Sequence, residues 1–159
     1  MTTNIILKDV SKFYGKKQAL NGINLEIEKG MFGLLGRNGA GKTTLMKSIA
    51  TLHSVSSGDI TVCGINISES SKIREMIGYL PQDFSMYSNM SAYEAMDYLG
   101  VLSGLDKKTR KERIPELLSK VNLNNNMKIK VKAMSGGMRR RLGIAQAILH
   151  NPKVLIVDE

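Results

Sequence analysis

The stretch GRNGAGKTT at residues 36–44 constrains the fold of this 159-residue chain more than any other feature. It contains the pattern G-x-x-x-x-G-K-[ST] through Gly36, Gly41, Lys42 and Thr43. In such a loop, successive backbone N–H groups converge on the oxygens of a phosphate chain, and the N-terminus of the following helix adds its positive end. The pattern therefore requires a strand before the loop and a helix after it.

The flanking sequence fits both requirements. Residues 31–36 (MFGLLG) form a short apolar run typical of a buried parallel strand, and a helical pattern runs over residues 42–52. Lys42 can reach the β- and γ-phosphates as a point charge, and the Thr43 hydroxyl can be a ligand of Mg²⁺. The alternative is a glycine-rich turn without function, but a chance match at average glycine content is roughly one in a few hundred. We interpret residues 36–44 as a phosphate loop.

A second pattern lies at the end of the sequence, where the apolar residues 154–157 (VLIV) are followed by Asp158 and Glu159. It predicts a buried strand with carboxylates at its carboxyl end, where sites gather in α/β sheets. Asp158 would hold the water shell of magnesium, and Glu159 would polarise the water that attacks the γ-phosphate. By itself this pattern is equally typical of a strand end that meets solvent. Beside the phosphate loop, we interpret it as the second half of one site.

A third pattern is MSGGMRRRLGIAQA at residues 134–147. Ser135 and the two glycines after it stand at the start of a predicted helix and form another N-terminus suited to anions. Because the first loop already holds one nucleotide, this N-terminus would serve a nucleotide bound by another copy of the chain. An ordinary capped helix explains the same residues at least as well, and both alternatives stay open.

The remaining patterns predict an α/β fold: a P-loop core with an antiparallel, β-rich N-terminal portion and a helical insertion. Ser91 and Glu94 match a capping box at one helix start, and Asn151-Pro152 is expected to end another helix. Strands are predicted at residues 5–14, 23–28, 31–36, 59–64, 77–80 and 154–158, and helices at 42–52, 69–76, 91–103, 107–121 and 136–150. We assign residues 1–82 to the phosphate-loop core and β portion, 83–150 to a helical subdomain and 151–159 to the final strand.

The net charge of +9 is concentrated in residues 105–141, which contain twelve Lys and Arg against three Asp and Glu. Such a surplus is typical of a surface that binds nucleic acid or anionic membrane. The solvated face of a helical region is the interpretation we favour, because Ile114, Leu117, Leu118 and Val121 recur at helical intervals. The segment also lacks aromatic residues that stack on bases. We expect no nucleic-acid partner.

Cysteine content and hydrophobicity indicate a cytosolic chain. The single cysteine, Cys63, excludes an internal disulfide framework and suits a reducing compartment. No apolar run approaches the roughly 18 residues that cross a bilayer, and the N-terminal residues lack the features of a signal peptide.

Four motifs resemble those of the ATP-binding-cassette ATPases and occur in that family's order. They are the phosphate loop, Gln82 in YLPQ, the signature Ser135-Gly136-Gly137, and VLIVDE. The resemblance covers residues 5–159. It implies an ATPase subunit on the cytoplasmic face of a membrane transporter, which hydrolyses ATP with Mg²⁺. It also implies that two cassettes pair head to tail around two ATP molecules, and that each signature contacts the γ-phosphate on the opposite phosphate loop. The sequence SGGMRRRLGIAQAIL looks most like bacterial exporter subunits, including antibiotic-resistance types.

The resemblance assigns further roles. Tyr14 matches the aromatic residue that stacks on adenine, although a core or surface tyrosine is the alternative. Gln82 would contact magnesium and the attacking water and link to the transmembrane permease, which faces the helical subdomain. Catalysis is assigned to Glu159, Gln82 and Lys42, and magnesium binding to Thr43, Gln82 and Asp158. The residues of the phosphate loop assigned to ATP are Gly36, Asn38, Gly39, Ala40, Gly41, Lys42, Thr43 and Thr44.

The sequence also departs from the family pattern. Arg37 replaces a common proline, which should be tolerated because only the backbone is needed. Met138 replaces a glutamine, which puts a ribose or backbone contact from that side chain in doubt. Neither His53 nor His150 matches the family's γ-phosphate histidine, and we expect both at the surface or at helix ends.

The family places that histidine beyond Glu159, together with a strand that inserts between the phosphate-loop strand and the strand ending in Asp158. We therefore expect the core sheet to be incomplete and the chain to be part of a longer protein. Two other functions remain as alternatives: a module that binds nucleotide without turnover, and a soluble relative that acts on nucleic acid or ribosomes.

Overall fold

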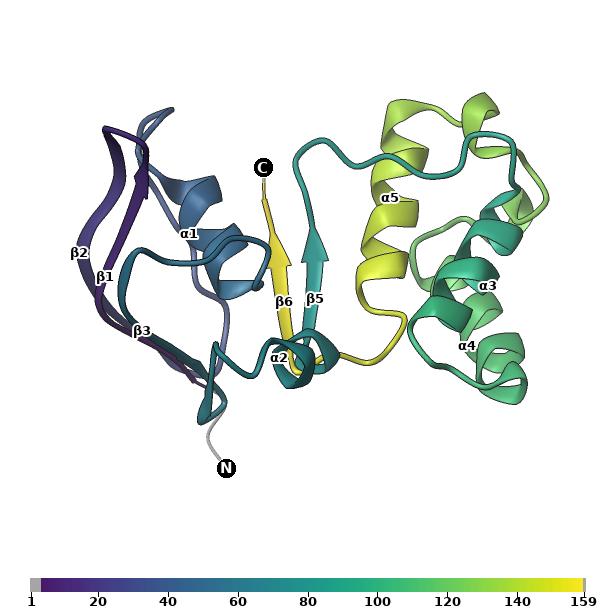
Figure 1. The fold of residues 1–159 in the computed structure, drawn as a ribbon. Helices are drawn as coiled ribbons and strands as arrows, with labels where there is room; N and C mark the ends of the chain where they lie inside the picture. The colour runs from purple at the N-terminus through teal and green to yellow at the C-terminus, as the bar shows by residue number, and fades with distance from the viewer. Residues whose placement is uncertain (1–3, 159) are drawn as a thin grey trace. The chain divides into compact units, whose positions relative to one another are not determined.

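A computed structural model describes residues 4–158 of the chain (Figure 1). The chain divides into two compact units, Met1–Ile77 and Gly78–Glu159. The phosphate loop belongs to the first unit. Gln82, Ser135 and Asp158 belong to the second. Glu159, the predicted catalytic base, lies outside the described residues.

The first unit is built on an antiparallel sheet with the strand order β2-β1-β3-β4. The strands are β1 (Ile5–Tyr14), β2 (Lys17–Ile27), β3 (Ser57–Val62) and β4 (Ile65–Asn66). Leu7, Val10, Ile60 and Val62 are almost fully buried and form its core. The predicted β-rich N-terminal portion is confirmed, although β2 begins earlier than the predicted residue 23, because Lys17 pairs with Tyr14 in a tight hairpin.

Helices α1 (Lys42–Ile49) and α2 (Ser70–Met76) complete this unit. Leu45 and Ile49 are the buried apolar side chains of α1, and Ile73 is fully buried in α2. α1 begins where the motif predicts but ends three residues before the predicted residue 52. Its last carbonyls accept hydrogen bonds from the N–H groups of residues 50–53, which turn the chain toward β3.

The predicted strand at residues 31–36 does not form, and this expectation was wrong for the structure described. Met31 and Leu35 are 102% and 93% exposed, which is the opposite of a buried strand. A central parallel strand is stable when neighbouring strands pair with its edges and other elements cover its faces. Within residues 4–158, no strand pairs with this segment. The core sheet is therefore incomplete within residues 4–158, as the sequence predicted.

In the second unit, strands β5 (Ile77–Leu80) and β6 (Val154–Val157) pair with each other and run in the same direction (Figure 1). Ile156 is buried, whereas Leu155 and Val157 are 44% and 38% exposed. At Gly78 a Cβ atom would lie 2.0 Å from the carbonyl oxygen of Ala147, so the backbone of β5 lies directly against the end of α5.

The helical segment consists of α3 (Ala92–Leu102), α4 (Lys107–Lys120) and α5 (Gly136–Ala147), with short 3-10 turns at Asn124–Asn126 and Val131–Ala133. The predicted capping box of α3 is present: the Ser91 side chain accepts from the Glu94 N–H, and the Glu94 carboxylate accepts from the Ser91 N–H. α5 ends at Ala147 and not at the predicted residue 150. The fully buried core residues of the segment include Met96, Ile114, Leu118, Leu123 and Leu142.

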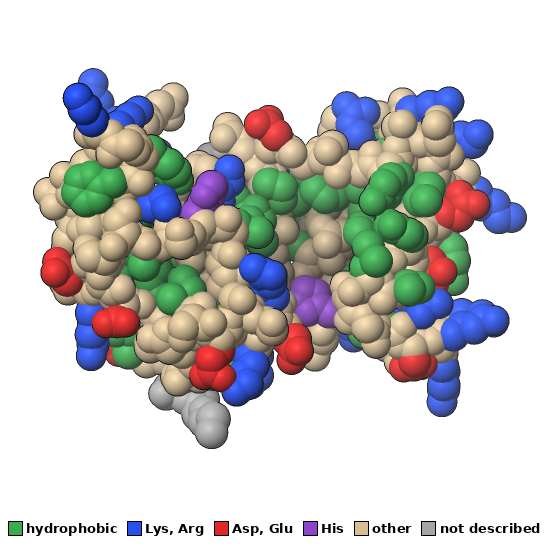
Figure 2. Space-filling view, in the orientation of Figure 1, with side chains coloured by type: hydrophobic (Ala, Val, Ile, Leu, Met, Phe, Trp, Pro, Cys, Tyr) green, Lys and Arg blue, Asp and Glu red, His purple; other side chains and the backbone are tan. Residues whose placement is uncertain are grey.

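Several basic residues of this segment turn inward. Arg110 forms an ion pair of 2.7 Å with Asp97, and this pair ties α4 to α3. Arg113 donates to the carbonyls of residues 148 and 149 at the end of α5, and Arg141 donates to the carbonyls of residues 121 and 122 at the end of α4. The exposed lysines of α4 fit the predicted solvated face, and Figure 2 shows Lys and Arg side chains along the outer surface of the helices. None of the helices in residues 4–158 has the length and hydrophobicity to cross a membrane.

Candidate nucleotide site

The glycines of the phosphate loop adopt conformations that other residues avoid. Gly39 and Gly41 have φ angles of 82° and 88°, in the left-handed region. A Cβ atom at Gly41 would also lie 2.5 Å from the carbonyl oxygen of Ala19 in β2. Both the backbone conformation and the close approach of β2 therefore require glycine directly before α1. The motif predicted the glycine but not its contact with β2.

Lys42 lies across this loop. Its Nζ donates to the carbonyl oxygens of Gly36 (2.6 Å) and Arg37 (3.0 Å). The first turn of α1, KTTL, contains no acidic residue, so nothing in it offsets the positive end of the helix. Thr43 and Thr44 lie in this turn and are partly buried. The loop therefore combines an ammonium group, a helix N-terminus and hydroxyl groups, which is a suitable set for a polyphosphate.

Tyr14 lies at the end of β1 with its side chain 44% exposed. The ring of His53 meets it edge-on, with centroids 6.0 Å apart and planes at 90°, and Lys12 Nζ lies 5.2 Å from the Tyr14 centroid. These neighbours contact the ring while much of it stays accessible, which suits the predicted stacking on a base. Sequence reasoning placed His53 at the surface and missed this contact, because nothing local links two residues from separate elements.

Asp158 directly follows β6, as the sequence predicted, and is 1% exposed. Its N–H donates to the carbonyl oxygen of Leu80 (2.9 Å), so the pairing with β5 fixes the backbone at this carboxylate. The Tyr79 hydroxyl in β5 donates to Asp158 Oδ2 (3.3 Å). Burial, followed by the negative charge of Asp158 and this hydrogen bond, raises the pKa of Tyr79 to about 12. The phenol thus stays a donor at neutral pH.

The other predicted residues of the second unit are more exposed. Gln82 lies in the loop two residues after β5. Ser135 is the N-cap of α5, where its Oγ accepts from the Met138 N–H (3.2 Å). Gly136 and Gly137 form the exposed first turn of α5, and a Cβ added at either would lie in open space. This arrangement is an ordinary capped helix with an accessible N-terminus, and its contact with a second copy stays a prediction.

Met138 explains one departure from the family pattern. Its side chain packs against the hydrophobic core of the helical segment. An apolar side chain is favoured at a position that faces other apolar side chains, so a thioether replaces an amide here without leaving a polar group unpaired.

The candidate ligands fit magnesium by their chemistry. Thr43, Gln82 and Asp158 offer oxygen atoms, which Mg²⁺ prefers as ligands. Few protein ligands are needed, because Mg²⁺ in such sites usually keeps several waters and also binds phosphate oxygens. Residues 4–158 contain no group of three or more His, Cys, Asp and Glu that could hold a metal ion without such help.

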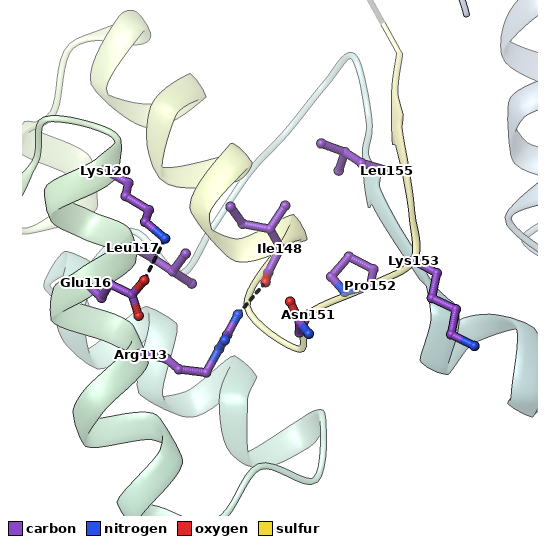
Figure 3. A pocket seen from close by; sticks show the side chains of 9 residues that line it. All are labelled: Arg113, Glu116, Leu117, Lys120, Ile148, Asn151, Pro152, Lys153 and Leu155. Carbon is purple, nitrogen blue, oxygen red and sulfur yellow. Dashed lines mark hydrogen bonds and ion pairs between the residues drawn. The ribbon is translucent and has the colours of Figure 1, made fainter. Parts of the chain in front are cut away.

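A separate cavity lies within the second unit (Figure 3). It has a volume of about 300 Å³, and its lining contains none of the described candidate site residues. Arg113 reaches the carbonyls at the end of α5 beside it, and Lys120 pairs with Glu116 (2.6 Å), which holds the pKa of that carboxyl below its usual range. The residues that line it are Arg113, Glu116, Leu117, Lys120, Ile148, Asn151, Pro152, Lys153 and Leu155.

A family profile described as "ABC transporter" matches residues 20–159 of the chain. The chain belongs to the ABC transporter family. It is 41% identical over 154 residues to the linearmycin resistance ATP-binding protein LnrL of Bacillus subtilis (strain 168), covering 96% of this chain and 50% of LnrL. It is 38% identical over 167 residues to the methionine import ATP-binding protein MetN of Corynebacterium jeikeium (strain K411), covering 99% of this chain and 45% of MetN.

Solved structures agree with this assignment. The ATP-binding cassette MJ0796, a dimer in a post-hydrolysis state bound to ADP and Pi, superposes with a TM-score of 0.86 at 28% identity and covers 98% of this chain and 73% of its own. The predicted fold class, an α/β P-loop core with an antiparallel, β-rich N-terminal portion and a helical insertion, is confirmed. The chain spans about half the length of the curated relatives it matches.

Proposed function

We propose that this chain forms the nucleotide-binding part of an ATPase subunit that powers a membrane transporter. The observation that carries the proposal is the phosphate loop: left-handed glycines at positions 39 and 41, followed by Lys42 at the start of a helix whose first turn contains no acidic residue. The MJ0796 cassette, which was captured with ADP and Pi, supports ATP hydrolysis as the reaction of the site.

The chemistry follows from the charge of the substrate. Backbone N–H groups of residues 38–43 would bind the β- and γ-phosphates, and Lys42 would exchange the carbonyls of Gly36 and Arg37 for phosphate oxygens. Thr43, Gln82 and Asp158 would hold Mg²⁺, which neutralises charge that develops on the transferred phosphoryl group.

Water then attacks the γ-phosphorus, and the bond to the β–γ bridging oxygen breaks. Gln82 would orient this water, and Glu159 would accept its proton, leaving ADP and phosphate. Tyr14 would stack on the adenine. The assignments of residues 1–82, 83–150 and 151–159 to core, helical subdomain and final strand belong to the same proposal.

The partners that we propose are a second cassette and a transmembrane permease at the cytoplasmic face of the membrane. The dimeric MJ0796 structure supports pairing of cassettes, and the accessible N-terminus of α5 at Ser135, Gly136 and Gly137 suits a contact with the nucleotide of the partner cassette. The helical segment would face the permease.

Export is the direction that we propose. LnrL, which is named for resistance to linearmycin, and the sequence of the signature helix support this direction. MetN, which is named for import, is similar to a comparable degree, so the direction needs its own measurement: substrate flux into or out of vesicles that contain the complete transporter.

The proposed reaction is tested by ATP hydrolysis of the complete protein in the presence of Mg²⁺. We expect Glu159→Gln to lower the rate about 100-fold or more while nucleotide binding is retained, because a general base is lost. Lys42→Ala should weaken nucleotide binding itself. Lys111→Ala, at an exposed position of α4, is the control and should match the wild type. An unchanged rate in Glu159→Gln would refute the role of Glu159 as base and favour another function.

A further inference from the structure

Tyr79 makes a contact to which the proposed reaction assigns no role. It lies in β5 beside the carboxyl end of β6, and its hydroxyl donates to Asp158 Oδ2 (3.3 Å). Both residues belong to the second unit. Asp158 is 1% exposed, and its backbone is fixed by the hydrogen bond from its N–H to the carbonyl oxygen of Leu80.

A carboxylate can still rotate about its Cβ–Cγ bond when its backbone is fixed, and that torsion is broad. A donor on Oδ2 restricts this rotation and thereby sets the direction in which Oδ1 points. Because Asp158 is 1% exposed, water does little to replace such a donor there.

We propose that Tyr79 is a positioning residue of the magnesium site: its hydroxyl holds the Asp158 carboxylate in the orientation that serves the ion. The inference rests on the proposed function, because Asp158 is assigned to magnesium there. Groups that orient metal ligands affect metal affinity by about 10- to 100-fold when they are removed. Phenylalanine at this position would keep the ring and its packing but lose the donor.

The test measures binding of Mn²⁺, a paramagnetic probe for the magnesium site, to the complete protein with ADP, by electron paramagnetic resonance. We expect Tyr79→Phe to raise the Mn²⁺ dissociation constant about 10-fold, while ADP binding in the presence of EDTA and the unfolding temperature stay at wild-type values. Tyr98→Phe is the matched control, because it removes a hydroxyl from an exposed tyrosine of α3 in the same unit. It should leave all three quantities unchanged.

Other outcomes separate the possibilities. Wild-type Mn²⁺ affinity in Tyr79→Phe overturns the inference. Equal losses of Mn²⁺ affinity and of metal-free ADP affinity also overturn it, because they indicate a general structural role of the hydrogen bond. If Mn²⁺ does not change the ADP affinity of the wild type, the proposed magnesium site is refuted. The inference about Tyr79 is then refuted too, for that separate reason.

Discussion

Residues 31–36 and the helical segment α3–α5 are both rich in apolar residues, yet they bury them to opposite degrees. Met31 and Leu35 are almost fully exposed, whereas Met96, Ile114 and Leu118 have no exposed surface. The helices pack on neighbours that are close in the sequence, because α3 contacts α4 and α4 contacts α5. A central strand depends on strands far away in the sequence, so its burial is conditional on a complete sheet.

The largest effect is expected for a pair of leucine truncations that tests this difference in burial. Leu118→Ala in α4 should lower the free energy of unfolding by about 3 kcal/mol, because it removes a fully buried side chain and leaves a cavity. Leu35→Ala should change it by less than about 0.5 kcal/mol, because Leu35 is exposed. Urea unfolding of the 159-residue chain measures both. Comparable losses would contradict the difference and indicate that residues 31–36 are buried in solution.

A pair of glycine substitutions tests the same difference by adding an atom. Gly78→Ala should cost about 2 kcal/mol, because its Cβ would meet the Ala147 carbonyl oxygen at 2.0 Å and β5 must shift. At Gly33 an added Cβ would lie in open space, so Gly33→Ala should be close to neutral. Thermal unfolding of the two variants gives the comparison. A larger loss of stability in Gly33→Ala than in Gly78→Ala would contradict the conclusion that residues 31–36 lie in an open environment.

A smaller effect is expected at the start of α3. Ser91→Ala should cost about 1 kcal/mol, because the Glu94 N–H loses the hydroxyl that caps it. Ser119→Ala, at an exposed position inside α4, should not destabilise the protein, since alanine favours a helix interior. The chemical unfolding midpoints of the two variants measure the difference. A cost at Ser119 equal to that at Ser91 would show that the cap contributes nothing specific.

The smallest effect is a dependence on pH. Hydrogen bonds from the Ser91 backbone and hydroxyl hold the pKa of Glu94 below its ordinary value of 4.5. Because the pKa is lowered in the folded state, the stabilisation is present above pH 4.5 and is lost as the pH falls through the folded value. The stability difference between the wild type and Glu94→Gln should therefore shrink on acidification. A difference that is independent of pH would exclude a charged Glu94 from the cap.

The sequence predicted the features that depend on contiguous residues. The phosphate loop before α1, the capping box at Ser91, the N-cap at Ser135 and the position of Asp158 after β6 each follow from a few adjacent residues. Local backbone conformation and capping determine these features, so a short stretch is sufficient to recognise them.

Features that depend on distant residues could not be predicted in the same way. The Tyr79–Asp158 hydrogen bond joins residues 79 positions apart, and it follows from the pairing of β5 with β6. The contact between Tyr14 and His53 depends on the packing of separate elements. The strand predicted at residues 31–36 failed for the same reason, since apolar character indicates the capacity for burial but not the presence of neighbours.

The hydrogen bonds from Arg113 and Arg141 to the ends of the neighbouring helices restrict how α4 and α5 can move. Arg113 of α4 binds carbonyls at the end of α5, and Arg141 of α5 binds carbonyls at the end of α4. Sliding or tilting of one helix against the other would break charged hydrogen bonds at both places, which makes the pair stiff. A displacement of Ser135, at the N-terminus of α5, would then move the lysine-rich surface of α4 as well. The two helices would therefore move together as one rigid body.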